Sequence, residues 1–387
     1  MRFRTGVLPG CMGEGRWNAV FLQAKFRSTD RALHRSPRVF AELPGMNAQG
    51  MTAVPRRRPR GLRPGDGIAL VAPARFAPEE RIAEAAEAIR AAGFTPILPP
   101  GLSARHLSFG GTDAHRAHVL NTCFRDPAVR AVWALRGGYG SARLLPLLDA
   151  AAFQADPKWI MGFSDITALH AWADRLGVAS LHAPVALTHR GELGEMVAAA
   201  GAARDIAAGA ARDKRWEIGD AAAGAAGDPA ASPREDGVVV GGNLSVLYSL
   251  LGTPYFPDVR GCVLLLEDLD EYLYHLDRML LAFRLAGIWE QVAGVAVGSF
   301  TDIRDNTRAF GQSVDNPFGR SVQEIFEDQI RPQHPDLPIV WDLPVGHGPV
   351  NRPVVLGCGG WILAKFAQNT TDVRSISGSF ENPAEGD

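Results

Sequence analysis

The sequence predicts an α/β protein, with an N-terminal domain built on a parallel sheet and a smaller, strand-rich C-terminal domain. Three observations lead to this fold class. Short apolar runs alternate with amphipathic helical segments through the first half, as in parallel α/β sheets. A stretch rich in Ala, Gly, Asp and Pro, from about 198 to 237, separates this half from a second series of short apolar runs. The 387 residues, 46% apolar and 21% charged, are enough for two globular domains.

The first strand and helix illustrate the pattern of the N-terminal half. Residues 68–72 are an apolar run that Pro73 stops, and residues 78–92 carry apolar side chains at helical spacing. Gly93 follows where a helix C-cap is expected. The same reading predicts further strands at 95–98, 131–135 and 159–161 and further helices at 114–123, 141–151 and 166–176.

The second half contains short strands around one strong helix, a pattern that by itself indicates a strand-rich α+β domain. The strands are expected at 237–240, 262–266, 292–297 and 338–341, and the helix at 272–285. The chain therefore divides into a basic extension predicted to be disordered (1–60), an N-terminal α/β domain (61–200), a linker (201–236), a C-terminal domain (237–367) and a polar tail (368–387).

The charge distribution and the cysteine content indicate which partners and which cell compartment to expect. Residues 1–60 carry a local net charge of +9, so the remainder is acidic, which argues against nucleic acid as a partner. The basic extension resembles a transit peptide, but a disordered extension or a true start near Met46 or Met51 is the simpler interpretation. No apolar run approaches 18 residues, so no membrane-spanning segment is expected. Four widely spaced cysteines indicate reduced thiols and a cytoplasmic protein.

Ser164 stands where a predicted strand ends and a helix begins. The apolar run 159–161 ends at Gly162, and helical spacing begins at Ile166. A hydroxyl on such a turn projects from the sheet, and the backbone N–H groups of a helix N-terminus can stabilise negative charge. A serine nucleophile requires both features. Because the segment is not the Gly-x-Ser-x-Gly elbow, an ordinary helix N-cap serine is the alternative.

A serine nucleophile also needs a general base, and His347 is the strongest candidate among ten histidines. It is flanked by glycines and prolines in the segment 343–349, as in a shaped, exposed loop. His170 follows Ser164 by six residues, so it points away from the turn and is expected to be a packing or surface residue. His182 either lines the opening of the same site or is a loop histidine without a functional role.

The base in turn needs an acid, and Glu267 is the preferred candidate. It directly continues the apolar strand 264–266, and functional groups collect at such strand ends in α/β proteins. Asp268, Asp270 and Glu271 fit better as a solvated acidic turn that caps the following helix.

A glycine-rich segment, Arg136-Gly-Gly-Tyr-Gly-Ser141, follows the strand 131–135. Such a loop can present backbone N–H groups to a phosphate or serve as a second oxyanion donor, and Gly138 is the candidate donor. A tight strand-to-helix turn would explain the glycines but not Arg136. The sequence contains no metal-ligand spacing, so neither a metal nor another cofactor is expected.

Taken together, these segments resemble the LD-carboxypeptidase family, the serine peptidases of the murein tetrapeptide carboxypeptidase and microcin-immunity type. The resemblance covers about residues 61–366, and its modest motifs occur in the family's order. They are Leu62–Asp66 with Val71–Pro73, Phe109–Asp113 with Arg116, Leu135–Gly140, Gly162–Asp165, Gly241–Ser245, Leu266–Asp268 with Asp277–Leu280, and Gly346 with His347.

The resemblance implies a triad of Ser164 as nucleophile, His347 as general base and Glu267 as the orienting carboxylate. It also implies that the smaller domain is of the swivelling β/α kind, that the active site lies between the domains, and that the protein is a homodimer. Oxyanion donors are expected from the backbone N–H groups of Asp165 and Gly138. Bidentate binding of a substrate carboxylate makes Arg136 and Arg278 the candidate clamps.

The implied function is a serine carboxypeptidase that cleaves an L,D-peptide bond and releases terminal D-alanine from muropeptide tetrapeptides in cell-wall recycling. The implied partner is this small peptide, without nucleic acid or membrane. Two alternatives remain at this point: a related serine peptidase acting on peptidyl- or aminoacyl-nucleotide antibiotics, and a non-catalytic α/β binding protein. The chain departs from the family pattern at Ala74, where serine is usual, in residues 1–60 and in a long segment at 302–320, which affect substrate choice more than chemistry.

Overall fold

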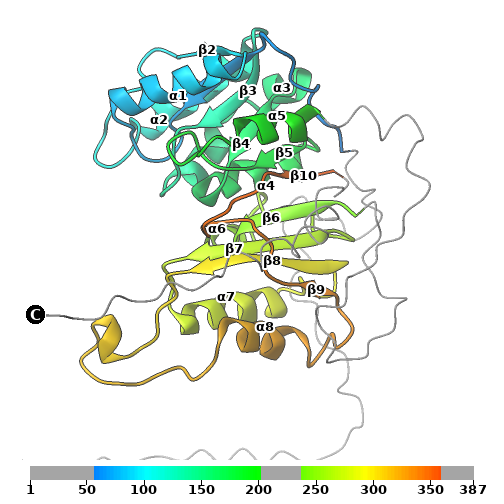
Figure 1. The fold of residues 1–387 in the computed structure, drawn as a ribbon. Coiled ribbons are helices and arrows are strands. Elements are labelled where there is room, and N and C mark those ends of the chain that lie inside the picture. Colours follow the sequence, from blue (N-terminus) through cyan, green and yellow to red (C-terminus); the bar gives the residue numbers. More distant parts are fainter. Residues whose placement is uncertain (1–55, 202–236, 359–387) are drawn as a thin grey trace, which may run out of the picture. The chain divides into compact units, whose positions relative to one another are not determined.

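The computed structural model describes residues 56–201 and 237–358 of the chain (Figure 1). Most of the predicted basic extension and linker, and the whole polar tail, lie outside these ranges. Within them, no helix combines the length and apolar character needed to cross a bilayer. Cys123, Cys262 and Cys358 are free thiols, as expected, and Cys11 lies outside the described residues.

Ordered contacts begin before Gly61, where the sequence placed the first structured residue. The Arg56 side chain donates from Nε to Asp174 Oδ1 at 3.0 Å, and the Arg57 backbone N–H donates to the Gly177 carbonyl at 2.9 Å. Arg56 and Arg57, which the sequence assigned to the extension, therefore contact residues more than a hundred positions further along the chain.

The first sheet has six strands in the order β10-β5-β4-β3-β1-β2. All neighbouring pairs are parallel except β10 with β5, which is antiparallel. The predicted parallel sheet is confirmed, whereas the edge strand β10, which returns from the far end of the described chain, was not predicted. The strands are β1 (Gly67–Val71), β2 (Thr95–Ile97), β3 (Val129–Ala134), β4 (Trp159–Gly162), β5 (Ser180–His182) and β10 (Val354–Leu356).

Helices cover both faces of this sheet, as in doubly wound folds. One face packs against α1 (Glu79–Ala91) and α5 (Leu193–Gly201). The other packs against α2 (Asp113–Arg125), α3 (Ala150–Ala155) and α4 (Thr167–Arg175).

The helix predicted at 141–151 is wrong. Residues Ser141–Leu147 form a 3₁₀ segment, and α3 begins separately at Ala150. Pro146 lies inside the predicted span, and without a backbone N–H it cannot continue an α-helical hydrogen-bond ladder.

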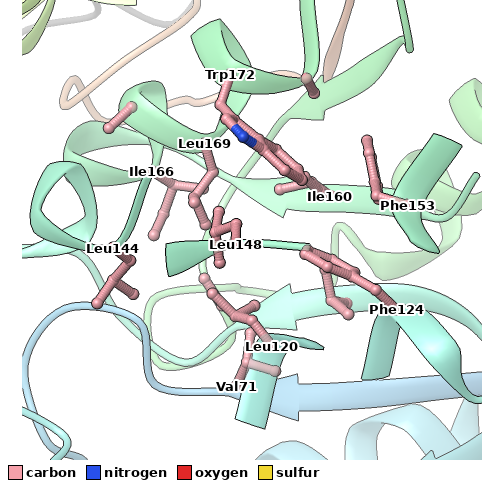
Figure 2. Packing of buried hydrophobic residues seen from close by; sticks show 14 of the residues in the cluster. Val71, Leu120, Phe124, Leu144, Leu148, Phe153, Ile160, Ile166, Leu169 and Trp172 are labelled. Atoms are coloured by element: carbon pink, nitrogen blue, oxygen red, sulfur yellow. The ribbon is translucent and has the colours of Figure 1, made fainter. Parts of the chain in front are cut away.

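The core under α2 and α4 supports the turn that carries Ser164. Figure 2 shows Ile166 and Leu169 of this region packed with side chains from β1, β4 and α2. The Phe124 and Trp172 rings stack with their centroids 5.7 Å apart. Each fully buried side chain of this size contributes about 1.5–3 kcal/mol. The segment directly after Ser164 is therefore held by a dense core.

The second sheet has four parallel strands in the order β6-β7-β8-β9. The α+β arrangement expected from its short strands is thus replaced by a parallel α/β one. The helix α8, which was not predicted, lies beside α7 on one side of the sheet (Figure 1). The elements are β6 (Val239–Asn243), β7 (Val263–Leu269), β8 (Gly294–Thr301), β9 (Ile339–Val340), α6 (Leu244–Leu250), α7 (Leu273–Leu285) and α8 (Val322–Ile330).

The opposite face of the second sheet is covered by the chain that runs from Leu343 toward β10. Leu343, Val345 and Val354 pack on Val263 and Leu265 in one apolar cluster. The segment that holds His347 therefore crosses β7, the strand that holds Glu267, before it joins the first sheet.

Candidate active site

Ser164 occupies a strained turn between β4 and α4. Its φ of 63° is left-handed, a conformation that costs a residue other than glycine about 1–2 kcal/mol. A 3₁₀ turn, Ser164–Ile166, connects the strand to the helix, and the Ser164 side chain caps neither segment by a hydrogen bond. The N-cap alternative therefore does not apply. A strained, partly exposed serine at this junction has the geometry of a nucleophile elbow.

The glycine-rich segment after β3 lies directly against this turn. A Cβ on Gly137 would come within 3.1 Å of Ser164 Cβ, 3.2 Å of its Oγ and 3.5 Å of the Asp165 backbone nitrogen. Asp165 fixes the contact from the other side, because its buried Oδ2 accepts the Ser141 N–H at 2.8 Å. Burial raises the pKa of Asp165, although the hydrogen bonds from Ser141 oppose the shift.

Glu267 and His347 form a close pair on the second sheet. The Nδ1 of His347 and the Oε2 of Glu267 are 2.6 Å apart. The Glu267 side chain is 0% exposed and that of His347 is 13% exposed. Burial alone would raise the pKa of Glu267, but the neighbouring His182 and His347 rings outweigh it and lower the pKa to about 2. The carboxylate is thus ionised at neutral pH and holds the imidazole at Nδ1, while Nε2 makes no hydrogen bond within the described residues.

The loop around His347 is held at both ends. The Gly348 N–H donates to Ser299 Oγ at 2.8 Å, and the Gly346 N–H donates to Asn351 Oδ1 at 2.9 Å. Gly346 has a φ of 108°, and a Cβ there would lie 2.7 Å from Glu267 Oε2. Only glycine fits between the loop and the carboxylate, which accounts for the Gly-His sequence.

Contacts between the two sheets bring this pair to the serine turn. The Phe163 ring, directly before Ser164, packs on the His347 ring with 4.6 Å between centroids. On the same side, the Asn243 N–H at the end of β6 donates to Thr167 Oγ1 at 3.0 Å, near the start of α4. The Glu267–His347 pair therefore lies against the residue that precedes Ser164, although the Ser164 side chain makes no hydrogen bond within the described residues.

The two candidate arginines are placed differently. Arg136 is half-buried next to Gly137 and makes no side-chain hydrogen bond or ion pair in the described part of the chain. Arg278 is exposed on α7, where its guanidinium lies 5.4 Å from the Tyr274 ring centre, and no described contact links it to the site. Sequence reasoning missed Arg75, an exposed residue whose Cδ lies 2.7 Å from where a Cβ of Gly138 would be.

His170 and His182, which the sequence analysis did not prefer as the general base, are both buried. His170 bonds to Ser180 Oγ and to the Gly162 carbonyl, each at 2.9 Å, and burial lowers its pKa to about 3. It is a packing residue, as expected. His182 is not in a loop: it ends β5, and its Nε2 lies 3.8 Å from Glu267 Oε1. The apolar run 178–181 before it was the available signal for a strand end.

Known proteins resemble this chain along both halves of its sequence. Residues 68–183 match the LD-carboxypeptidase N-terminal domain, and residues 236–360 match the LD-carboxypeptidase C-terminal domain. This chain belongs to the LD-carboxypeptidase family.

Individual relatives agree with the family assignment. The murein tetrapeptide carboxypeptidase of Pseudomonas aeruginosa is 31% identical over 303 residues, covering 75% of this chain and 91% of the relative. The muramoyltetrapeptide carboxypeptidase structure from Oxalobacter formigenes superposes with a TM-score of 0.58 at 24% identity, over 76% of this chain and 92% of that one. The structure of the microcin C7 self-immunity protein MccF in complex with aspartyl sulfamoyl adenosine superposes with a TM-score of 0.60 at 20% identity. This match covers 77% of this chain and 93% of that one.

Membership of the LD-carboxypeptidase family makes this protein a serine-type carboxypeptidase, a hydrolase, and removes the non-catalytic alternative. The family's peptide chemistry implies a small peptide substrate. Among the described residues of this carboxypeptidase, no group of three His, Cys, Asp or Glu side chains is placed to hold a metal ion.

Proposed function

We propose that this carboxypeptidase cleaves the L,D-peptide bond of muropeptide tetrapeptides and releases terminal D-alanine. Ser164 is the nucleophile, His347 the general base and Glu267 the carboxylate that orients the imidazole. One observation carries the assignment: the 2.6 Å Glu267–His347 pair packs through the His347 ring on Phe163, the residue before the strained Ser164.

The reaction proceeds through an acyl-enzyme. His347 takes the Ser164 proton as Oγ attacks the carbonyl, and returns it to the leaving amine of D-alanine. Water then attacks the ester while His347 takes its proton, and His347 returns this proton to Ser164 Oγ as the bond between Oγ and the acyl carbon breaks and the shortened peptide leaves. The oxyanion is stabilised by the backbone N–H groups of Asp165 and Gly138, which flank the close contact between Gly137 and Ser164. One such donor contributes about 3 kcal/mol to transition-state stabilisation.

The terminal carboxylate of the substrate is bound by Arg136, with Arg75 as a second cation. Arg136 adjoins Gly137 at the serine, and the Arg75 side chain, from the segment after β1, lies over Gly138, so both arginines flank the loop beside the nucleophile. Neither makes an ion pair within the described ranges, which leaves them available for bidentate binding. Arg278 takes no part in this proposal.

Mass spectrometry of disaccharide-tetrapeptide incubated with the protein tests the proposal. The expected product has lost one alanine, and Ser164→Ala abolishes the loss while its melting temperature stays near that of the wild type. Retained turnover by Ser164→Ala would refute the assignment. A parallel assay with an aminoacyl-nucleotide separates muropeptide hydrolysis from the alternative activity on nucleotide antibiotics.

The carboxylate clamp has its own test. Wild-type enzyme should prefer the tetrapeptide with a free carboxylate over the same peptide with a C-terminal amide, and Arg136→Ala should lose most of this preference. Arg105→Ala, an exposed arginine stacked on Phe76, is the matched control and should keep it. An unchanged preference in Arg136→Ala would place the clamp elsewhere.

The homodimer implied by the family and the cytoplasmic location inferred from the widely spaced cysteines remain predictions. Light scattering on the purified full chain and fractionation of the producing cells test them.

A further inference from the structure

The two oxygens of Glu267 have different surroundings. Oε2 accepts the hydrogen bond from His347, whereas Oε1 has no hydrogen-bond partner although it is buried. A buried carboxylate oxygen without a donor is costly, and an orienting carboxylate with one donor can rotate about its Cγ–Cδ bond. A second donor would remove the cost and fix the orientation.

The His182 ring faces this oxygen, and its own nitrogens also lack hydrogen-bond partners. Its side chain is 0% exposed, neither ring nitrogen has a hydrogen-bond partner in the described part of the chain, and Nε2 lies 3.8 Å from Glu267 Oε1. An unused ring nitrogen of His182 and an unused carboxylate oxygen of Glu267 therefore face each other, both buried from solvent. A shift of about 1 Å makes a normal hydrogen bond between them.

The groups around His182 leave Glu267 as its partner. His170, whose ring centre is 6.2 Å away, already uses both nitrogens on Ser180 and Gly162 and is neutral because burial lowers its pKa to about 3. Phe163, at 5.9 Å, offers only its ring. The other titratable groups near Glu267 are His347 and Asp268, and Asp268 accepts hydrogen bonds from the Asn243 side chain and the Ser245 N–H.

The backbone position of His182 connects this contact to the nucleophile. His182 is in register with Gly162 on β4, two residues before Ser164, and with Val354 on β10. A bond from His182 to Glu267 therefore joins the sheet that carries the serine to the strand that carries the acid.

From this geometry we infer that His182 is a positioning residue that donates its Nε2–H to Glu267 Oε1 and fixes the carboxylate for His347. The inference rests on the proposed function. It predicts that His182→Leu, which keeps the volume and loses the donor, lowers kcat about 10- to 100-fold with KM within about twofold. His182→Gln, whose amide can donate at similar reach, should recover most of kcat, whereas the shorter His182→Asn should not.

Proton NMR of the full chain provides a readout that a packing role would not change. The proton shared by His347 Nδ1 and Glu267 gives a downfield resonance, which should shift or broaden in His182→Leu and return in His182→Gln. His170→Leu is the matched control: it removes an equally buried histidine, lowers the unfolding midpoint and leaves the resonance in place. Because no substrate is needed, the spectrum remains informative if Ser164→Ala retains turnover and the proposed function fails.

Three results would overturn the inference. An unchanged resonance and kcat in His182→Leu would make His182 a packing residue, and so would an equal change in His170→Leu. The third, decisive even if the Leu variant does not fold, is equal activity of His182→Gln and His182→Asn.

Discussion

Replacing Glu267 by Gln tests the electrostatic role of the buried carboxylate. The pKa of Glu267 falls from 4.5 to about 2 in the folded protein, and each unit corresponds to 1.36 kcal/mol, so the ionised form stabilises the fold by about 3 kcal/mol at neutral pH. Because the folded pKa is depressed, this contribution is complete above pH 4.5 and is lost as the pH falls toward 2. The Gln side chain cannot ionise, so the variant lacks this part of the pH dependence.

Urea unfolding of wild type and Glu267→Gln between pH 6 and 2.5 measures the effect. The difference in unfolding free energy between the two proteins should shrink by about 2.5 kcal/mol as the pH falls through this window, because part of the contribution is still present at pH 2.5. Glu84→Gln, an exposed carboxylate on α1, is the control for removing a carboxylate at the surface. Parallel curves for wild type and Glu267→Gln would refute the reasoning. The same variant should lose about 10³- to 10⁴-fold in kcat, because an amide presents the wrong partner to His347 Nδ1.

Of three further substitutions, two probe close contacts at the site and one probes an ion pair away from it. Gly137→Ala places a methyl group about 3.1 Å from the Ser164 side chain, so kcat/KM for the tetrapeptide should fall at least about tenfold, with a circular dichroism spectrum like that of the wild type. Gly346→Ala places a Cβ at a positive φ and against the buried Glu267 carboxylate. It should therefore lower the unfolding free energy by about 2 kcal/mol and reduce kcat. Wild-type values for both quantities would contradict the close approach of Gly346 to Glu267. Asp174→Ala leaves the Arg56 guanidinium without its buried partner and should cost about 3 kcal/mol in urea unfolding, while kcat/KM of the folded enzyme stays near wild type.

The local features of the site could be predicted from sequence. Ser164 follows an apolar strand and precedes a helical pattern, Glu267 extends another strand, and His347 lies between glycines, so each local conformation has a short-range signal. The parallel N-terminal sheet follows from the same alternation of apolar runs and helices.

Other features depend on contacts between segments far apart in the chain. Arg75 approaches Gly138 and His182 approaches Glu267 only after the sheets have formed and packed, so their spacing in the sequence carries no signal. The three-residue strand β10 is too short for a periodic pattern and exists because β5 offers it an edge. The prediction of a helix across Pro146 was wrong for a local reason, because proline has no backbone N–H to continue the helical hydrogen bonds.

The central claim is that one serine, activated by the Glu267–His347 pair, is the nucleophile of this enzyme. Labelling of the full chain with a fluorophosphonate, followed by peptide mapping, tests it most directly. The account predicts a single adduct on Ser164, formed much more slowly in His347→Ala. An adduct on a different serine, or no adduct in a preparation that hydrolyses tetrapeptide, would contradict it.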